Sequence, residues 1–76
     1  MTGLPVLAGA EVVRALERAG YVVVRISGSH HRLVHSTDPT RATTVPVHAG
    51  RMLKRGTLRG IIKQAGLTVD EFRNLL

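Results

Sequence analysis

The 76-residue sequence contains no cysteine, which excludes disulfide bonds and thiolate metal sites. Only one tyrosine and one phenylalanine are present, and tryptophan is absent, so recognition of nucleic-acid bases by stacking is disfavoured. The apolar runs are short, Tyr21 to Val24 being typical, and fall far below the length of a membrane span. We therefore expect one domain over residues 1–76, soluble, cytoplasmic and without a membrane segment.

Carboxylates are also scarce, because five Asp and Glu residues accompany eleven Lys and Arg residues, a net charge of +6. The imbalance is local, since residues 51–63 hold five cations and no carboxylate. Such a patch favours a polyanionic partner through phosphate contacts and counterion release. Charge alone leaves open a solvated surface and a surface for an acidic protein. The five cations are Arg51, Lys54, Arg55, Arg59 and Lys63.

The pattern of apolar residues predicts alternating helical and extended segments, separated by Gly, Ser, Asp and Pro. Gly20 is suited to end the first helix, and Thr57 and Gly66 to bound the second. A capping box at Thr68 predicts a short third helix. The expected elements are a helix over residues 11–19, strands over 21–26, 30–35 and 43–47, a helix from Thr57 to Gly66 and a helix from Thr68.

This order predicts an α+β fold of α-β-β-β-α order with a helical appendix. The three strands are expected to form a small antiparallel sheet, with the helices packed on one face because nothing else is available to cover it. Pro46 lacks a backbone N–H, so the third strand is expected at an edge or to stop pairing there. We expect Met1 to Pro5 to be poorly ordered.

Two of the four histidines, His30 and His31, directly follow the turn at Ser27, Gly28 and Ser29. Because alternate residues of a strand share a face, His30 projects with Arg32, whereas His31 projects the other way. An imidazole transfers protons near neutral pH, and a guanidinium holds a phosphate.

The cluster also has a purely structural interpretation, in which His30 and His31 are two ordinary polar residues where a strand begins. A metal site is disfavoured, since the spacings of the histidines match no common ligand pattern and structural zinc sites usually include cysteine. A nucleophilic triad from Ser29 and His30 fails to assemble, because the nearest acid in sequence, Asp38, lies in an expected turn. We expect no metal and no cofactor.

Two further segments have both a structural and a functional interpretation. Gly28 permits the positive φ of a turn, and it also allows a phosphate to approach the backbone amides around Ser29. Lys54 and Arg55 form a basic loop before a helix, and basic side chains beside free N–H groups at a helix start are suited to an anion.

Three segments taken together, Gly28 to His30, Thr44 to His48 and Gly56 to Leu67, resemble the HicA family of bacterial toxins. Their order and spacing match across nearly the whole chain. The resemblance implies a fold similar to a double-stranded-RNA-binding domain and the activity of an mRNA interferase. It also implies that this toxin of a type II toxin–antitoxin system is inhibited by a HicB antitoxin, which we expect to cover the active site.

In this family the histidine after Gly-Ser is catalytic, so the resemblance implies His30, with His31 in reserve because the doubled histidine allows a one-residue shift. Neutral His30 would take the proton of an RNA 2′-hydroxyl without a metal. The alternative is a non-catalytic RNA-binding module in which His30 only donates or accepts a hydrogen bond. Expected RNA or phosphate contacts are Gly28, Ser29, Arg32, His48, Lys54 and Arg55.

Overall fold

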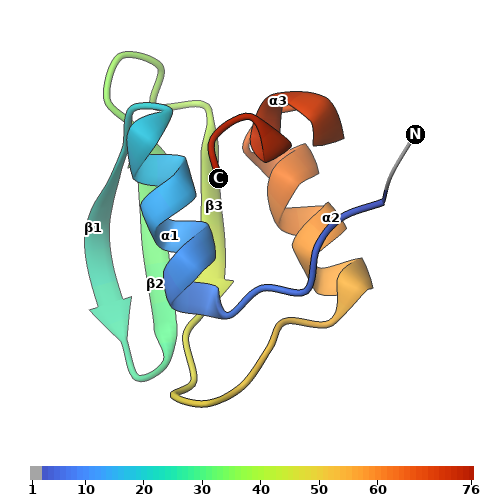
Figure 1. Ribbon diagram of the computed structural model, residues 1–76. Coiled ribbons are helices and arrows are strands. Elements are labelled where there is room, and N and C mark those ends of the chain that lie inside the picture. Colours follow the sequence, from blue (N-terminus) through green and yellow to red (C-terminus); the bar gives the residue numbers. More distant parts are fainter. Residues whose placement is uncertain (1–2) are drawn as a thin grey trace.

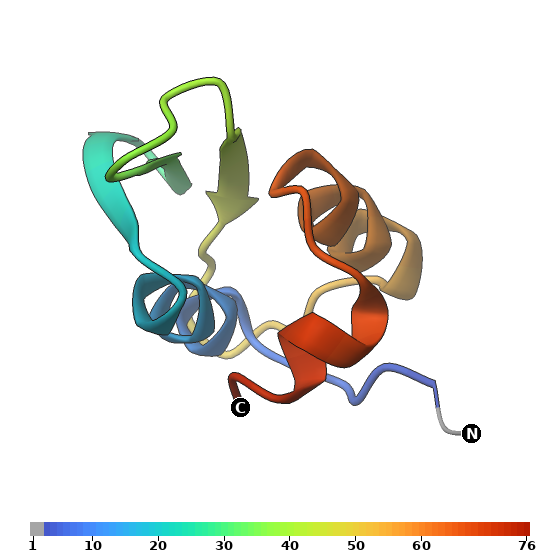
Figure 2. The same ribbon diagram turned by 90° about the horizontal axis from the view of Figure 1, so that it is seen from above.

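A computed structural model describes residues 3–76 as one antiparallel sheet accompanied by helices on a single side (Figure 1). The strand order is β1-β2-β3, so β3 is an edge strand and ends at Pro46, as expected from its missing donor. Viewed from above, the opposite side of the sheet carries no helix within residues 3–76 (Figure 2). The predicted α+β fold is confirmed. The elements are α1 (Gly9–Arg18), β1 (Tyr21–Ser27), β2 (His30–His35), β3 (Ala42–Pro46), α2 (Arg55–Gln64) and α3 (Val69–Arg73).

The core lies between the sheet and the helices. Each strand directs alternate apolar side chains into it, because successive residues of a strand point to opposite faces. Burying one such aliphatic or aromatic side chain stabilises the fold by roughly 1.5–3 kcal/mol. The largest fully buried side chains are Phe72, Leu16, Leu33, Leu58, Val12, Val45 and Thr43.

The C-terminal end of α2 is fastened to the sheet through the backbone carbonyl of Ala65. The buried Tyr21 hydroxyl of β1 donates a hydrogen bond to this oxygen. The guanidinium of Arg41 donates two more, from Nε at 3.1 Å and Nη2 at 2.9 Å. These bonds satisfy a carbonyl that a helix end leaves without an intrahelical partner. They set the position of α2 relative to β1 and β3, and hence where α2 begins at its other end.

The start of α2 differs from the prediction. The helix begins at Arg55, not after a cap at Thr57, because the Leu58 N–H already donates to the Lys54 carbonyl at 3.0 Å. Lys54 is the N-cap residue, and its side chain makes no capping hydrogen bond. Thr57 lies exposed inside the first turn. Gly66 follows the helix with a φ of 73°, as its expected role requires.

The segment before α1 is also more ordered than expected. Leu4 is buried in the core, so the expectation of disorder for Met1 to Pro5 is wrong at this residue, while Met1 and Thr2 lie outside the described residues. Leu7, which follows the segment, is buried as well. Ala8 forms an isolated antiparallel bridge with Met52. The chain entering α1 thus packs beside the loop that leads to α2.

Candidate functional site

One end of the sheet gathers segments that are far apart in the sequence. The turn at Gly28 and Ser29, the end of β3, the loop over residues 47–54 and the starts of α1 and α2 all lie at the lower end in Figure 1. The N–H of Val47 donates to the Ser29 carbonyl at 2.7 Å, and the N–H of Leu53 donates to the Leu7 carbonyl at 2.8 Å. The loop is therefore tied to the sheet at one end and to the segment before α1 at the other.

His30 and Arg32 project from the uncovered face of the sheet. His30 lies opposite Ser27 of β1 and Pro46 of β3, and both His30 and Arg32 are exposed. Nη1 of Arg32 donates to Oγ1 of Thr44 at 3.2 Å, and the other guanidinium N–H groups have no acceptor among residues 3–76. The predicted shared face of His30 and Arg32 is confirmed.

His31 projects to the helix-covered face, as its neighbour Leu33 does. Its partner on β3 is Val45, which is fully buried. The His31 side chain is half-buried, and its Nδ1 atom is buried without a hydrogen-bond partner among residues 3–76. The two adjacent histidines therefore occupy different environments and cannot act on the same atom from the same side.

A basic depression lies beside His30, where β3 leads into the loop. It contains two predicted contact residues, His48 and Lys54, and one cation to which the sequence assigned no individual role, Arg51. His30 adjoins it because its cross-strand partner Pro46 forms part of the lining. The lining residues are Pro46, His48, Arg51, Met52, Leu53, Lys54 and Thr57.

The N-terminus of α2 opens beside this depression. The first turn of the helix contains no acidic residue, and Lys54 and Arg55 are exposed there. The first N–H groups of a helix lack intrahelical acceptors and carry partial positive charge. Together with the two cationic side chains they form a strongly electropositive corner, suited to a phosphate.

A protein-family model described as HicA toxin of bacterial toxin–antitoxin matches residues 9–67. The chain belongs to the HicA toxin family. It is accordingly the toxin of a bacterial toxin–antitoxin system, in which an antitoxin is the partner of the toxin. The range that matches the HicA model begins at the first residue of α1 and includes His30, the basic depression and all of α2. A search of curated proteins found no match.

The turn before β2 of this HicA chain has the conformation that its glycine predicts. Gly28 has a φ of 58°, in the region that other residues rarely adopt, so its role in the turn is confirmed. A Cβ atom placed on Gly28 would meet no atom within 4 Å, so the space in front of the turn is open. The Ser29 carbonyl accepts a hydrogen bond from the Val47 N–H, and this bond holds the turn against the end of β3.

The structure separates Asp38 from Ser29 and His30. Asp38 lies in the loop between β2 and β3, at the opposite end of the sheet, where its Oδ1 accepts from Oγ1 of Thr40 at 2.5 Å. This hydrogen bond lowers the pKa of the Asp38 carboxyl group. A triad of Ser29, His30 and Asp38 is thus excluded by position. Among residues 3–76 no three His, Asp or Glu side chains cluster as metal ligands would, and no helix is long and apolar enough to cross a membrane.

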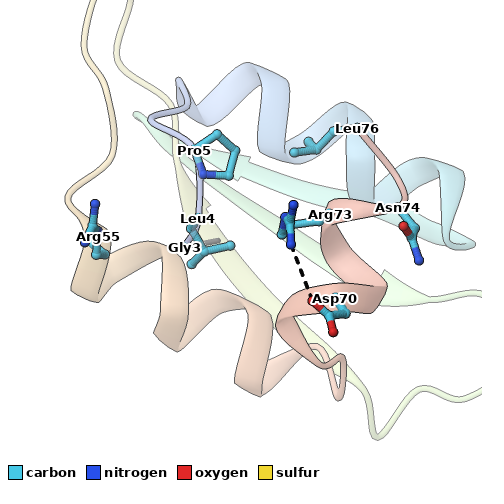
Figure 3. A pocket seen from close by; sticks show the side chains of 8 residues that line it. All are labelled: Gly3, Leu4, Pro5, Arg55, Asp70, Arg73, Asn74 and Leu76. Atoms are coloured by element: carbon cyan, nitrogen blue, oxygen red, sulfur yellow. Dashed lines mark hydrogen bonds and ion pairs between the residues drawn. The ribbon is translucent and has the colours of Figure 1, made fainter. Parts of the chain in front are cut away.

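A second hollow, seen in Figure 3, lies between the N-terminal segment, α2 and α3. Arg73 forms an ion pair there with Asp70 at 3.5 Å. Arg55 is the only predicted contact residue in its lining, and none of the four histidines contributes to it. The hollow beside His30 is therefore the better site for chemistry.

Two cations near His30 were not among the residues predicted as contacts. Arg51 lies in the basic depression because the loop after β3 folds back onto the segment before α1, a tertiary contact without a local sequence signal. Arg25 lies opposite Arg32 on the uncovered face. The sequence did contain an indication of this position. In a regular strand Arg25 would project into the core with Tyr21 and Val23, and charged residues are rarely buried there.

Proposed function

We propose that this HicA-family toxin is a metal-independent endoribonuclease that cleaves mRNA in the cytoplasm, with His30 as its general base. The observation that carries the proposal is the position of His30, which is exposed beside Arg32 and next to the basic depression. A polymer can reach an exposed imidazole, and the surrounding cations attract its phosphates.

The chemistry requires only an imidazole, cations and the RNA itself. Neutral His30 removes the proton of a 2′-hydroxyl, the 2′-oxygen forms a bond to the adjacent phosphorus, and the bond to the 5′-oxygen breaks. The leaving 5′-oxygen takes up a proton from water, which gives a 2′,3′-cyclic phosphate and a 5′-hydroxyl, and His30 then releases its proton to the solvent. Arg32 and Lys54 oppose the negative charge that develops on the phosphoryl oxygens. Gly28 and Ser29 leave room for the RNA backbone to approach.

His31 is the alternative base. Its ring is half-buried, and its Nδ1 atom, buried without a hydrogen-bond partner among residues 3–76, is out of reach of RNA. It lacks a cation in its own strand on the same face, where its neighbours are Leu33 and Val45. The cations beside His30 therefore make His30, not His31, the proposed general base.

A non-catalytic RNA-binding module is the second candidate function. It is favoured by the absence, within residues 3–76, of any hydrogen bond that would orient the His30 ring, since general bases are usually held by a neighbouring group. RNA itself would have to complete the site. If binding occurs without cleavage, this second function applies.

The antitoxin partner is proposed to be a HicB-like protein that covers His30 and the basic depression. These exposed polar surfaces are the ones that RNA would need, and complementary acidic groups would bind them fastest and most selectively. Inhibition would then result from occlusion of the site. A complex that leaves His30 accessible to solvent would contradict this arrangement.

The ribonuclease proposal predicts a selective reaction in the presence of a chelator. Purified protein with excess EDTA is expected to cleave a single-stranded RNA and to leave DNA of the same sequence intact, because DNA lacks the attacking hydroxyl. Gel analysis of the two end-labelled oligonucleotides measures both. Cleavage that stops with EDTA, or equal cleavage of the DNA, would contradict the mechanism.

A further inference from the structure

The register of β1 changes between Val23 and Arg25, where the strand contains an irregularity of the kind made by a β-bulge. Val23 pairs with Leu33 of β2, and Arg25 pairs with the next residue, Arg32. Val24 is left without a partner. An extra residue of this type reverses the alternation of faces along the rest of the strand. Tyr21 and Val23 face the core, whereas Arg25 lies with Arg32 on the uncovered face.

This pairing places Arg25 and Arg32 at opposite positions of adjacent strands, and both side chains are exposed. Neither Arg25 nor Arg32 forms an ion pair among residues 3–76, where Arg73 with Asp70 is the only one. The single side-chain hydrogen bond of the pair runs from Arg32 to Thr44. Both arginines are thus exposed without a carboxylate partner among residues 3–76, which leaves them available to a bound anion.

The arginine pair is adjacent to the proposed catalytic row. Along β2, Arg32 and His30 are two residues apart, a separation of about 6.6 Å on the same face. The row that contains His30 continues through Ser27 on β1 and Pro46 on β3, which leads to the basic depression. His30 therefore lies between the arginine pair and the depression that contains Lys54.

We propose that Arg25 and Arg32 together bind RNA phosphate beside His30, so that the RNA backbone crosses the uncovered face of the sheet. This inference rests on the proposed function, because it names a substrate contact of the same site. The bulge at Val24 is the local feature that makes the contact available. Arg25 acts by binding, since two guanidinium forks can hold the oxygens of one phosphate or of two neighbouring phosphates.

The test uses binding of an uncleavable RNA, so that it does not depend on catalysis. A single-stranded 2′-O-methyl RNA lacks the attacking hydroxyl and keeps every phosphate. Binding by the wild type, by Arg25→Gln and by the matched control Arg14→Gln is measured over a range of salt concentrations. Arg14 is exposed on α1, on the helix-covered side, and its substitution removes the same charge. Thermal unfolding of each variant checks the fold.

Arg25→Gln is expected to weaken RNA binding about tenfold, as loss of a charge-assisted contact does, and to reduce the magnitude of the slope of log affinity against log salt by about 0.7. Its thermal stability is expected to be close to that of the wild type, because Arg25 is exposed and forms no ion pair among residues 3–76. Arg14→Gln should change the affinity far less. Equal affinities of the two variants would overturn the inference.

Two other outcomes separate this inference from the ribonuclease proposal. If the wild type fails to cleave ordinary RNA while Arg25→Gln still weakens binding, the catalytic proposal fails and the phosphate contact stands. If Arg25→Gln instead reduces binding only to an acidic peptide such as poly-glutamate, the surface binds protein and the inference is overturned.

Discussion

Replacement of His30 by alanine is expected to lower the rate of RNA cleavage by about 100- to 10,000-fold, the usual contribution of a positioned general base. The fold should be unaffected, because the His30 side chain is exposed and forms no hydrogen bond within residues 3–76. Binding of uncleavable RNA should change little, since the cations remain. Single-turnover cleavage, RNA binding and thermal unfolding measure the three properties.

His31→Ala is the matched comparison for this prediction, because the two histidines are adjacent and point to opposite faces. We expect it to retain most of the activity of the folded protein while losing some stability, since its ring is half-buried. The reverse pattern, with an active His30→Ala and an inactive, folded His31→Ala, would move the general base to the helix-covered face.

Gly9→Ala is expected to destabilise the protein by roughly 2–3 kcal/mol, a large share of the stability of so small a domain. A Cβ atom on Gly9 would lie 2.1 Å from the carbonyl oxygen of Pro46 and 3.0 Å from Cα of Val47. Both are backbone atoms, so α1 and the end of β3 must separate. Because Pro46 adjoins His30, cleavage by the remaining folded fraction should also fall.

Gly60→Ala provides the control, since it makes the same change at a helical position that has space. A Cβ atom on Gly60 would meet nothing within 4 Å, and alanine favours a helix over glycine by about 0.5–1 kcal/mol. Urea unfolding should therefore move in opposite directions for the two variants. An unchanged midpoint for Gly9→Ala would contradict the close packing of α1 on β3.

Much of the fold could be predicted because its boundaries are marked by residues with strong local preferences. Gly20, Gly28 and Gly66 have positive φ values and stand where a helix ends or a hairpin turns. The start of α2 was misplaced because Thr57 is a good cap by type, whereas the backbone of Lys54 begins the helix without a side-chain acceptor. That choice depends on how the loop packs, which no local preference encodes.

The candidate site was predictable where it follows strand alternation and unpredictable where it follows tertiary contacts. The shared face of His30 and Arg32 results from alternation alone, and the register confirms it. Arg25 was missed because no distinctive residue marks the bulge at Val24. A charged residue at a strand position that should face the core could have indicated the bulge. The approach of Arg51 depends on the pairing of distant segments.

The most direct test of the central claim is to identify the ends of the RNA fragments that the wild type produces in excess EDTA. The mechanism predicts 2′,3′-cyclic phosphates with 5′-hydroxyl ends, formed by the wild type and not by His30→Ala. Fragments with 3′-hydroxyl and 5′-phosphate ends, or a folded wild-type protein that leaves RNA intact, would contradict a histidine-dependent ribonuclease.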